Sequence, residues 1–285
     1  MTTDLNQRLA DILGQHPARI SPLSGGCVGE VYRVDLANGR SLVAKVDGSS
    51  GAALDKEGWM LHYLATKSAL PVPDILHSSP DMLLMSLLPG RSSFDARSEA
   101  HAAALLAELH AVSAPAYGLD TDTLIGGLHQ PNPWTESWIE FFRQQRLLFM
   151  ARTAYDAGRL PAHILARVET LAGKLERWLE EPSAPALIHG DIWSGNVLAQ
   201  SGRVTGFLDP AIYYADSEME LAFITLFHTF GDAFFRRYDE LHGIRPGFWE
   251  TRRDLYNLYP LLVHVRLFGG GYVSSVQRIL SQFGV

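Results

Sequence analysis

The feature that most constrains the fold is a change of hydrophobic pattern at Pro89-Gly90. Before this point, short apolar runs separated by turn residues predict an antiparallel sheet, with Asn38-Gly39 as a tight hairpin turn. The predicted strands span residues 19–23, 30–36, 41–46 and 82–88, and one helix is predicted over residues 53–65. After Pro89-Gly90, helical spacing predicts helices over residues 98–112, 134–157, 162–180, 218–238 and 248–280, with residues 187–208 briefly extended.

A β-rich segment followed by a longer helical segment predicts an α+β molecule with two unequal lobes. We expect a small lobe over residues 1–88 and a larger, mainly helical lobe over residues 89–285. The chain of 285 residues is long enough for such an arrangement. A cleft is expected near residues 86–90, because ligands favour the junction between two lobes.

The charge balance excludes some classes of partner. The chain has 24 Lys plus Arg against 31 Asp plus Glu and no basic cluster, which argues against a nucleic-acid partner. No stretch approaches the roughly 18 uncharged apolar residues of a membrane helix, and the first residues lack a signal-peptide pattern. We therefore expect a cytoplasmic protein without a membrane partner. The single cysteine, Cys27, excludes an intramolecular disulfide and disfavours structural zinc.

The segment His189 to Leu198, HGDIWSGNVL, carries the most specific pattern. Asp191 precedes Asn196 by five residues, two short strands follow, and Asp209 ends the second of them. Because such a hairpin returns the chain to its start, we expect these three side chains to cluster. Two oxygen ligands and a separate carboxylate suit Mg²⁺ bound to phosphates, with one Asp left to orient a hydroxyl. The alternative is that these residues only cap turns.

A lysine within an apolar strand marks a second candidate site. Only four of the basic residues are lysines, and Lys45 alone lies inside such a strand, in Val43-Ala44-Lys45-Val46. An unpaired ammonium there would be costly, so a partner is expected, and Glu57 on the following helix is the natural candidate. An exposed lysine on an edge strand is the alternative.

These motifs together resemble those of a known superfamily. His189-Gly190-Asp191 with Asn196 and Asp209 resembles the protein-kinase-like phosphotransferases, including the aminoglycoside phosphotransferase branch. HGDIWSGNVL, FLDPAIYY at 207–214, LYNLYP at 255–260 and FGGGY at 268–272 look more like the fructosamine kinases, or ketosamine-3-kinases. The resemblance covers nearly the whole chain and is strongest over residues 187–272. It implies a bilobal protein-kinase-like fold.

The resemblance also implies roles for the motif residues. Asp191 would be the catalytic base that accepts the proton of the substrate hydroxyl, and Asn196 and Asp209 would be Mg²⁺ ligands. Lys45 would hold the α and β phosphates of ATP, and Glu57 would position it. ATP and Mg²⁺ are the implied cofactors.

A glycine-bearing loop over residues 24–29 precedes Lys45. It offers Gly25, Gly26 and Gly29, departs from G-x-G-x-x-G, and is expected to cover the phosphates with backbone N–H groups. Glycines also serve plain hairpins, so the loop taken alone is weak support. Cys27 at its tip is either a small buried hydrophobe or a reactive thiol, the latter open to an intersubunit disulfide.

The resemblance places the adenine-binding hinge at Met85 to Leu88. Recognition there would use the backbone carbonyl of Ser86 and the N–H of Leu88, with Leu87 between them. An ordinary strand end would look the same in sequence.

Substrate contacts are expected from polar and aromatic residues near the motif and in the tail. An indole face suits a sugar ring or an attached amine, which makes Trp193 the first candidate. The other candidates are Tyr213, Tyr214, Asp216, Glu218, His264 and Tyr272. Core packing is the competing explanation for the tyrosines, and an amphipathic helix is the competing explanation for the tail residues.

Three further residues are expected to support the catalytic loop. His189 and His110 are interpreted as hydrogen-bonded supports behind it. Where relatives commonly carry Asp-Leu-Ala, this chain has Glu220-Leu221-Ala222, which keeps the carboxylate but lengthens its reach.

The predicted function is ATP- and Mg²⁺-dependent phosphorylation of a sugar hydroxyl of a small-molecule ketosamine, either a ribulosamine or a fructosamine. In the fructosamine kinases, phosphorylation at the third sugar carbon makes the adduct unstable and so repairs glycated amines. One alternative is a kinase for another small molecule, such as an aminoglycoside or an amino alcohol. A second is a nucleotide-binding regulator without turnover. The ketosugar, the carrier of the amine and the choice between monomer and homodimer stay open.

Overall fold

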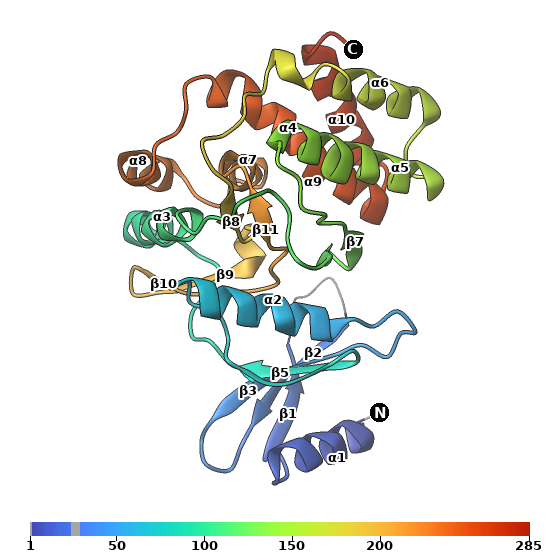
Figure 1. Ribbon diagram of the computed structural model, residues 1–285. Coiled ribbons are helices and arrows are strands. Elements are labelled where there is room, and N and C mark those ends of the chain that lie inside the picture. Colours follow the sequence, from blue (N-terminus) through green and yellow to red (C-terminus); the bar gives the residue numbers. More distant parts are fainter. Residues whose placement is uncertain (1, 24–28) are drawn as a thin grey trace.

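The small lobe is built on one antiparallel sheet (Figure 1). The computed structural model describes residues 2–23 and 29–285. The five strands run in the order β1 (Arg19–Pro22), β2 (Glu30–Asp35), β3 (Ser41–Val46), β5 (Met82–Ser86) and β4 (Ile75–Ser79). The predicted meander of the first three strands is confirmed, and β3 is a central strand. Strand β4 had not been predicted.

A helix covers each face of this sheet. Strand side chains alternate between faces, so Leu42 and Ala44 pack with Leu9 of α1 (Thr2–Leu13). Val43 and Leu83 pack on the opposite face with residues of α2 (Leu54–Lys67). The prediction of a single helix in this lobe was therefore wrong, because α1 precedes the sheet and closes its second face.

The large lobe is mainly helical, as predicted. Its helices are α3 (Ala96–His110), α4 (Trp138–Phe141), a π-helix (Phe142–Leu148), α5 (Phe149–Asp156), α6 (Ala162–Ala172), a 3₁₀ turn (Leu175–Arg177), α7 (Glu218–Leu226), α8 (Asp232–Leu241), a second π-helix (Phe248–Arg252), α9 (Arg253–Phe268) and α10 (Gly271–Gln282). Two predicted helices are each divided in two. Gly269 and Gly270 have φ values of 70° and 46°, which end α9 before α10 begins. A break after Leu226 separates α7 from α8.

Short strand pairs lie where the large lobe meets the small one (Figure 1). Strand β9 (Val197–Gln200) pairs with β10 (Arg203–Phe207), as predicted from the motif. Strand β8 (Ala186–Ile188) pairs with β11 (Tyr213–Ala215), and β6 (Thr123–Ile125) pairs with β7 (Leu128–Gln130). The last three of these strands had not been predicted.

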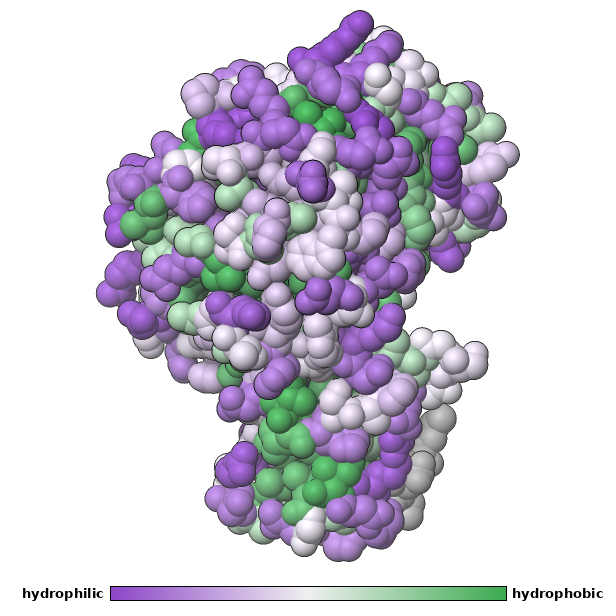
Figure 2. Space-filling view, viewed as in Figure 1, coloured by the Kyte–Doolittle hydropathy of each residue, from purple (hydrophilic) through white to green (hydrophobic). Residues whose placement is uncertain are grey.

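Helix α2 contributes to the cores of both lobes. Leu54 and Leu61 pack with the sheet, whereas Met60 and Leu64 belong to the large hydrophobic cluster of the helical lobe. The surface narrows between the two lobes, and an apolar area is exposed on the small one (Figure 2). Among residues 2–23 and 29–285, no helix is long and apolar enough to cross a membrane.

Candidate active site

The predicted lysine and its partner meet between the sheet and α2. Lys45 is 7% exposed, and its Nζ lies 2.6 Å from Oε1 of Glu57. The same ammonium pairs with Oδ1 of Asp209, a residue of the large lobe. Because β3 is central in the sheet, Lys45 is not the edge-strand lysine of the alternative interpretation. One cation thus links both lobes.

Lys45, Glu57 and Asp209 shift one another's pKa values. Burial alone would lower the pKa of Lys45, but the carboxylates of Glu57 and Asp209 outweigh burial and raise it above its usual value. Burial raises the pKa of Glu57 to about 8. Burial would also raise the pKa of Asp209, but Lys45 holds it below its usual range. The ammonium of Lys45 is therefore held in its charged form by carboxyl groups from both lobes.

The catalytic motif forms a tight loop after β8. Gly190 has a φ of 86°, and a side chain there would run into the backbone carbonyl of Ala211. Nδ2 of Asn196 donates to Oδ2 and to the backbone carbonyl of Asp191, at 2.9 and 3.0 Å. The N–H of Leu208 donates to the carbonyl of Asn196 at 2.9 Å, which brings the next residue, Asp209, to the same end of the β9–β10 hairpin. The predicted cluster is therefore present.

The environment of Asp191 favours a proton acceptor that works near neutral pH. Burial and the nearby charge of Asp209 raise the pKa of Asp191 to about 8, and the hydrogen bond from Asn196 only partly offsets them. A carboxyl with a pKa in this range can take up a proton from a hydroxyl and release it to solvent.

The same cluster has the donor atoms that a hard cation requires. The amide nitrogen of Asn196 is occupied by Asp191, and within the described parts of the chain no hydrogen bond engages its Oδ1. Asp209 carries a second carboxylate oxygen beyond the one that meets Lys45. Carboxylate and amide oxygens are preferred Mg²⁺ ligands, so these residues fit the cation that the sequence implies.

Glu220 supports the loop from behind. Its carboxylate accepts the N–H of Gly190 at 2.6 Å and the N–H of His189 at 3.2 Å, and it lies 2.9 Å from Nε2 of His110. The predicted support by His110 is therefore present. His189 also supports the loop, because the N–H of Asp191 donates to its Nδ1 at 3.4 Å, whereas its buried Nε2 has no partner among the described residues.

We predict that Glu220→Gln destabilises the folded protein by about 1–3 kcal/mol, since an amide loses one of the acceptors of the buried loop N–H groups. Burial would raise the pKa of Glu220, but His110 and the loop N–H of Gly190 hold it below its usual value. The stabilisation is therefore full above the unfolded pKa of about 4.3 and is lost as pH falls through the lower folded value. Urea unfolding of both proteins at pH 7 and at pH 3.5 would test this. An equal difference at both pH values would contradict it.

A cavity of about 250 Å³ opens beside Asp191. The predicted substrate residues that line it are Trp193, Tyr213, His264 and Tyr272. Trp193 is 37% exposed, and its indole lies against Gly195, where any side chain would collide with the ring. The Trp193-Ser194-Gly195 sequence thus sets an aromatic face beside Asp191.

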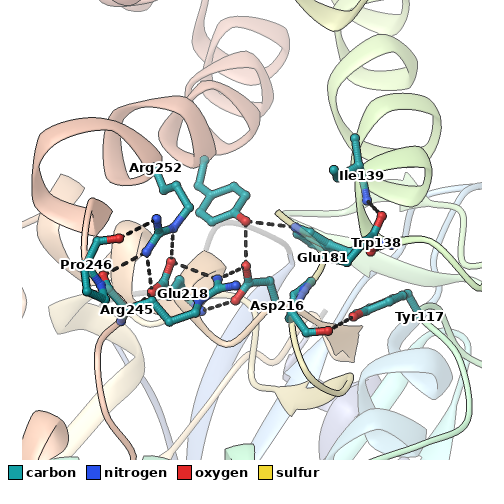
Figure 3. A network of polar contacts seen from close by, with 11 residues as sticks. Tyr117, Trp138, Ile139, Glu181, Asp216, Glu218, Arg245, Pro246 and Arg252 are labelled. Carbon is teal, nitrogen blue, oxygen red and sulfur yellow. Dashed lines mark hydrogen bonds and ion pairs between the residues drawn. The ribbon is translucent and has the colours of Figure 1, made fainter. Parts of the chain in front are cut away.

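The structure does not place Tyr214, Asp216 or Glu218 at this cavity. Tyr214 is buried, and its hydroxyl lies 3.2 Å from that of Tyr63. Asp216 and Glu218 are buried in the ion-pair network of Figure 3, where Asp216 pairs with Arg245, and Glu218 pairs with Arg245 and Arg252. These carboxylates hold α7 to the segment before α9 and are not free to bind a substrate.

The nucleotide loop is described only in part. Gly25, Gly26 and Cys27 lie outside the described residues, and Gly29 lies beside the backbone of Val46. At the predicted hinge, the N–H of Ser86 donates to the carbonyl of Asp74 at 2.9 Å.

The next two residues of the hinge differ in how their backbone is bonded. The N–H of Leu87 donates to the carbonyl of Ser41 at 3.4 Å. Within the described residues the N–H of Leu88 has no hydrogen-bond partner, so it is available to a ligand.

Sequence reasoning missed a buried arginine behind the cavity. Arg146 lies in the first π-helix and is 0% exposed, with its guanidinium 3.8 Å from the ring centre of Tyr213. Its terminal nitrogens donate to Oδ1 of Asn132 at 2.6 Å and to the carbonyl of Pro131 at 2.7 Å. Arg146 stands in the sequence beside Arg143, Gln144 and Gln145, so no local pattern distinguished the buried arginine from an exposed one.

The two lobes, the Lys45–Glu57 pair and the Asp191–Asn196–Asp209 cluster define a phosphotransferase of the protein-kinase-like class. The fold is shared with a solved aminoglycoside phosphotransferase, APH(4)-Ia, with a TM-score of 0.67 and 16% identity over 98% of this chain and 99% of that one. The family model described as fructosamine kinase matches residues 1–284. The chain belongs to the fructosamine kinase family, and it is an ATP-dependent small-molecule kinase.

Individual relatives agree with this assignment. A probable ketoamine kinase of Synechocystis sp. is 35% identical over 97% of this chain and 94% of its own length. A chloroplastic protein-ribulosamine 3-kinase of Oryza sativa subsp. japonica is 32% identical over 93% of this chain and 78% of its own length. A crystal structure of a candidate fructosamine-3-kinase from Thermobifida fusca has a TM-score of 0.85 and 30% identity, covering 97% of this chain and 98% of that one.

Proposed function

We propose that this kinase transfers the γ-phosphate of ATP to the hydroxyl on the third sugar carbon of a ketosamine. The observation that carries the proposal is a single cavity lined by both Asp191 and the exposed indole of Trp193. Asn196 and Asp209, the proposed cation ligands, belong to the same cluster as Asp191. The names of its relatives, ketoamine kinase and protein-ribulosamine 3-kinase, support the choice of substrate class.

Each residue of the site has a role in this proposal. Asp191 accepts the proton of the sugar hydroxyl, and Asn196 holds the Asp191 carboxylate in place through its amide nitrogen. Lys45 binds the α and β phosphates, and Glu57 orients its ammonium. Asn196 Oδ1 and Asp209 hold Mg²⁺, which when bound neutralises the charge that develops on the phosphates. The N–H of Leu88 and the carbonyl of Ser86 bind adenine.

The structure disfavours the first alternative substrate, an aminoglycoside. A polycation needs an acidic pocket, for which the sequence offers Asp216, Glu218 and Glu220. Asp216 and Glu218 are paired with Arg245 and Arg252 away from the cavity. Glu220 lines the cavity, but its carboxylate is engaged by the loop N–H groups and His110. A regulator without turnover is also disfavoured, because Asp191, Asn196, Asp209 and Lys45, the residues proposed to act as base, metal ligands and phosphate-binding group, are all present.

A screen of ADP release with ribulosamines, fructosamines, aminoglycosides and free sugars tests the proposal. We expect turnover with ketosamines, dependence on Mg²⁺ that EDTA abolishes, and a product whose phosphate nuclear magnetic resonance places on the third carbon. A higher kcat/KM for an aminoglycoside would overturn the choice of substrate. ADP release that no acceptor increases would favour the regulator.

We further propose that residues 1–88 form the nucleotide-binding lobe and residues 89–285 the catalytic and substrate lobe. The five-stranded sheet and Lys45 lie in the first segment, and Asp191, Asp209 and the cavity lie in the second. The N–H groups of Arg91 and Ala199 each donate to the other residue's carbonyl at 2.9 Å, which anchors the chain to the large lobe directly after this boundary.

A further inference from the structure

The walls of the cavity beside Asp191 are apolar over most of their area. Besides the sugar-facing aromatic residues, the lining is formed mainly by side chains of α7, α9 and α10: Phe223, Phe227, Val263, Leu267, Phe268 and Tyr272. A ketose presents hydroxyl groups along its whole length and needs polar partners. A wall of this composition therefore matches another part of the substrate.

The cavity extends well beyond the reacting group. Tyr259, Val263, Leu267 and Phe268 of α9 all line it, and at 1.5 Å per residue the nine steps from Tyr259 to Phe268 span roughly 13 Å. Tyr259 lies at the Asp191 end, because its hydroxyl donates to Oε1 of Gln130 at 2.6 Å and Gln130 donates to the carbonyl of Ala211, which lies against Gly190. Phe268 at the other end is 55% exposed. A sugar placed at Asp191 leaves the Phe268 end for the amine and its substituent.

No cation among the described residues lines this space. Its only carboxylates are Asp191 and Glu220, and Glu220 is fully engaged by the catalytic loop and His110. His264 is neutral near pH 7, because burial lowers its pKa, and its Nδ1 donates to the carbonyl of Pro260 at 2.8 Å. The guanidinium of Arg146 stacks on Tyr213 and bonds to Asn132, outside the lining.

We propose that the ketosamine accepted here carries an apolar amine substituent without a carboxylate, an aromatic or long aliphatic group that occupies the Phe268 end. This inference rests on the proposed function. Burying apolar surface against these walls is favourable. A carboxylate in the same place would lose its hydration without gaining a cationic partner and would lie in a cavity that already holds Asp191.

Two fructose adducts that differ by one carboxylate test this directly. The adduct of phenethylamine and that of phenylalanine share the ring and the linker. We expect kcat/KM to be at least about tenfold higher for the phenethylamine adduct, as an unpaired buried charge discriminates strongly. The adduct of phenylalaninamide, which is uncharged at the same position, is expected to lie within a few-fold of it. The adduct of ethanolamine, which lacks the ring, is expected to be poorer than that of phenethylamine.

If the amine substituent occupies the Phe268 end, a substitution at Phe268 should change the ratio of kcat/KM between the phenethylamine and phenylalanine adducts. Phe268→Arg supplies a cation there and should narrow the difference between the two adducts by several-fold, mainly by raising kcat/KM for the phenylalanine adduct. Leu241→Arg is the matched control, because Leu241 is 45% exposed on α8 and does not line the cavity. It should leave the ratio unchanged.

The possible failures are distinguishable. Equal kcat/KM for the phenethylamine and phenylalanine adducts, or preference for the latter, would overturn this inference and leave the ketosamine kinase intact. Turnover of none of the adducts, with ADP release stimulated by another acceptor class, would overturn the proposed function and this inference with it.

Discussion

Asp209→Asn is expected to lower kcat on the order of 10³-fold or more, at least as much as Asp191→Asn. In the proposed mechanism Asp209 makes two contacts: one carboxylate oxygen pairs with Lys45, and the other would bind Mg²⁺. In the same proposal Asp191 contributes proton transfer, which would be worth roughly 10²- to 10⁴-fold. A loose phosphoryl-transfer transition state depends more on charge neutralisation than on an early proton acceptor.

Single-turnover kinetics with a saturating ketosamine would measure both variants. Asp11→Asn, a change of an exposed carboxylate on α1, is the matched control and should retain wild-type rates. Circular dichroism should show all three proteins folded. An Asp209 variant that keeps more activity than the Asp191 variant would contradict the assignment of Asp209 as a cation ligand.

Lys45→Met is the second change with a large expected effect. We expect ATP turnover to fall by roughly 10²-fold or more while the protein stays folded. Methionine keeps the apolar stem inside β3 but removes the ammonium to which we assign phosphate binding. The carboxylates left behind need not stay charged, because Glu57 already has a pKa of about 8 and takes up a proton when its cation is lost.

The comparison variant is Lys67→Met, an exposed lysine at the end of α2. Steady-state kinetics over a range of ATP concentrations and thermal unfolding would be measured for both. Near-wild-type turnover of Lys45→Met would exclude the phosphate-binding role. Loss of activity together with loss of the folded structure would instead indicate a structural role.

The residues that carry the chemistry could be predicted because each lies in a local pattern. Asp191 and Asn196 lie five residues apart, and Asp209 follows at the end of a short hairpin, so local geometry alone brings them together. Lys45 was recognisable because a charge in an apolar strand requires a partner. The fold class followed from the change of periodicity at residue 89.

The predictions that failed concern side chains whose partners are distant in the sequence. Asp216 and Glu218 follow the motif closely and look available, but Arg245 and Arg252 neutralise them from about 30 residues further along the chain. Tyr214 is likewise occupied by Tyr63 of the other lobe. Proximity to a motif in sequence does not show which way a side chain points once helices pack around it.

The errors in secondary structure have local causes. Leu5 and Leu9 have helical spacing within the 12 residues of α1, so the sequence carried a signal for this helix that the prediction missed. The predicted helix over residues 248–280 contains Gly269, Gly270 and Gly271, and these glycines reverse the chain so that α10 packs back on α9.

The shared position of α2 has a mechanical consequence. Met60 and Leu64 attach this helix to the large lobe, while Glu57 on the same helix holds Lys45 of the sheet. A rotation that swings the small lobe, with α2, away from the large lobe therefore separates Lys45 from Asp209 and uncovers Met60 and Leu64. Opening of the cleft would therefore also break the Lys45–Asp209 contact of the proposed phosphate site. A nucleotide that binds best when this contact is made would favour the closed arrangement of the lobes.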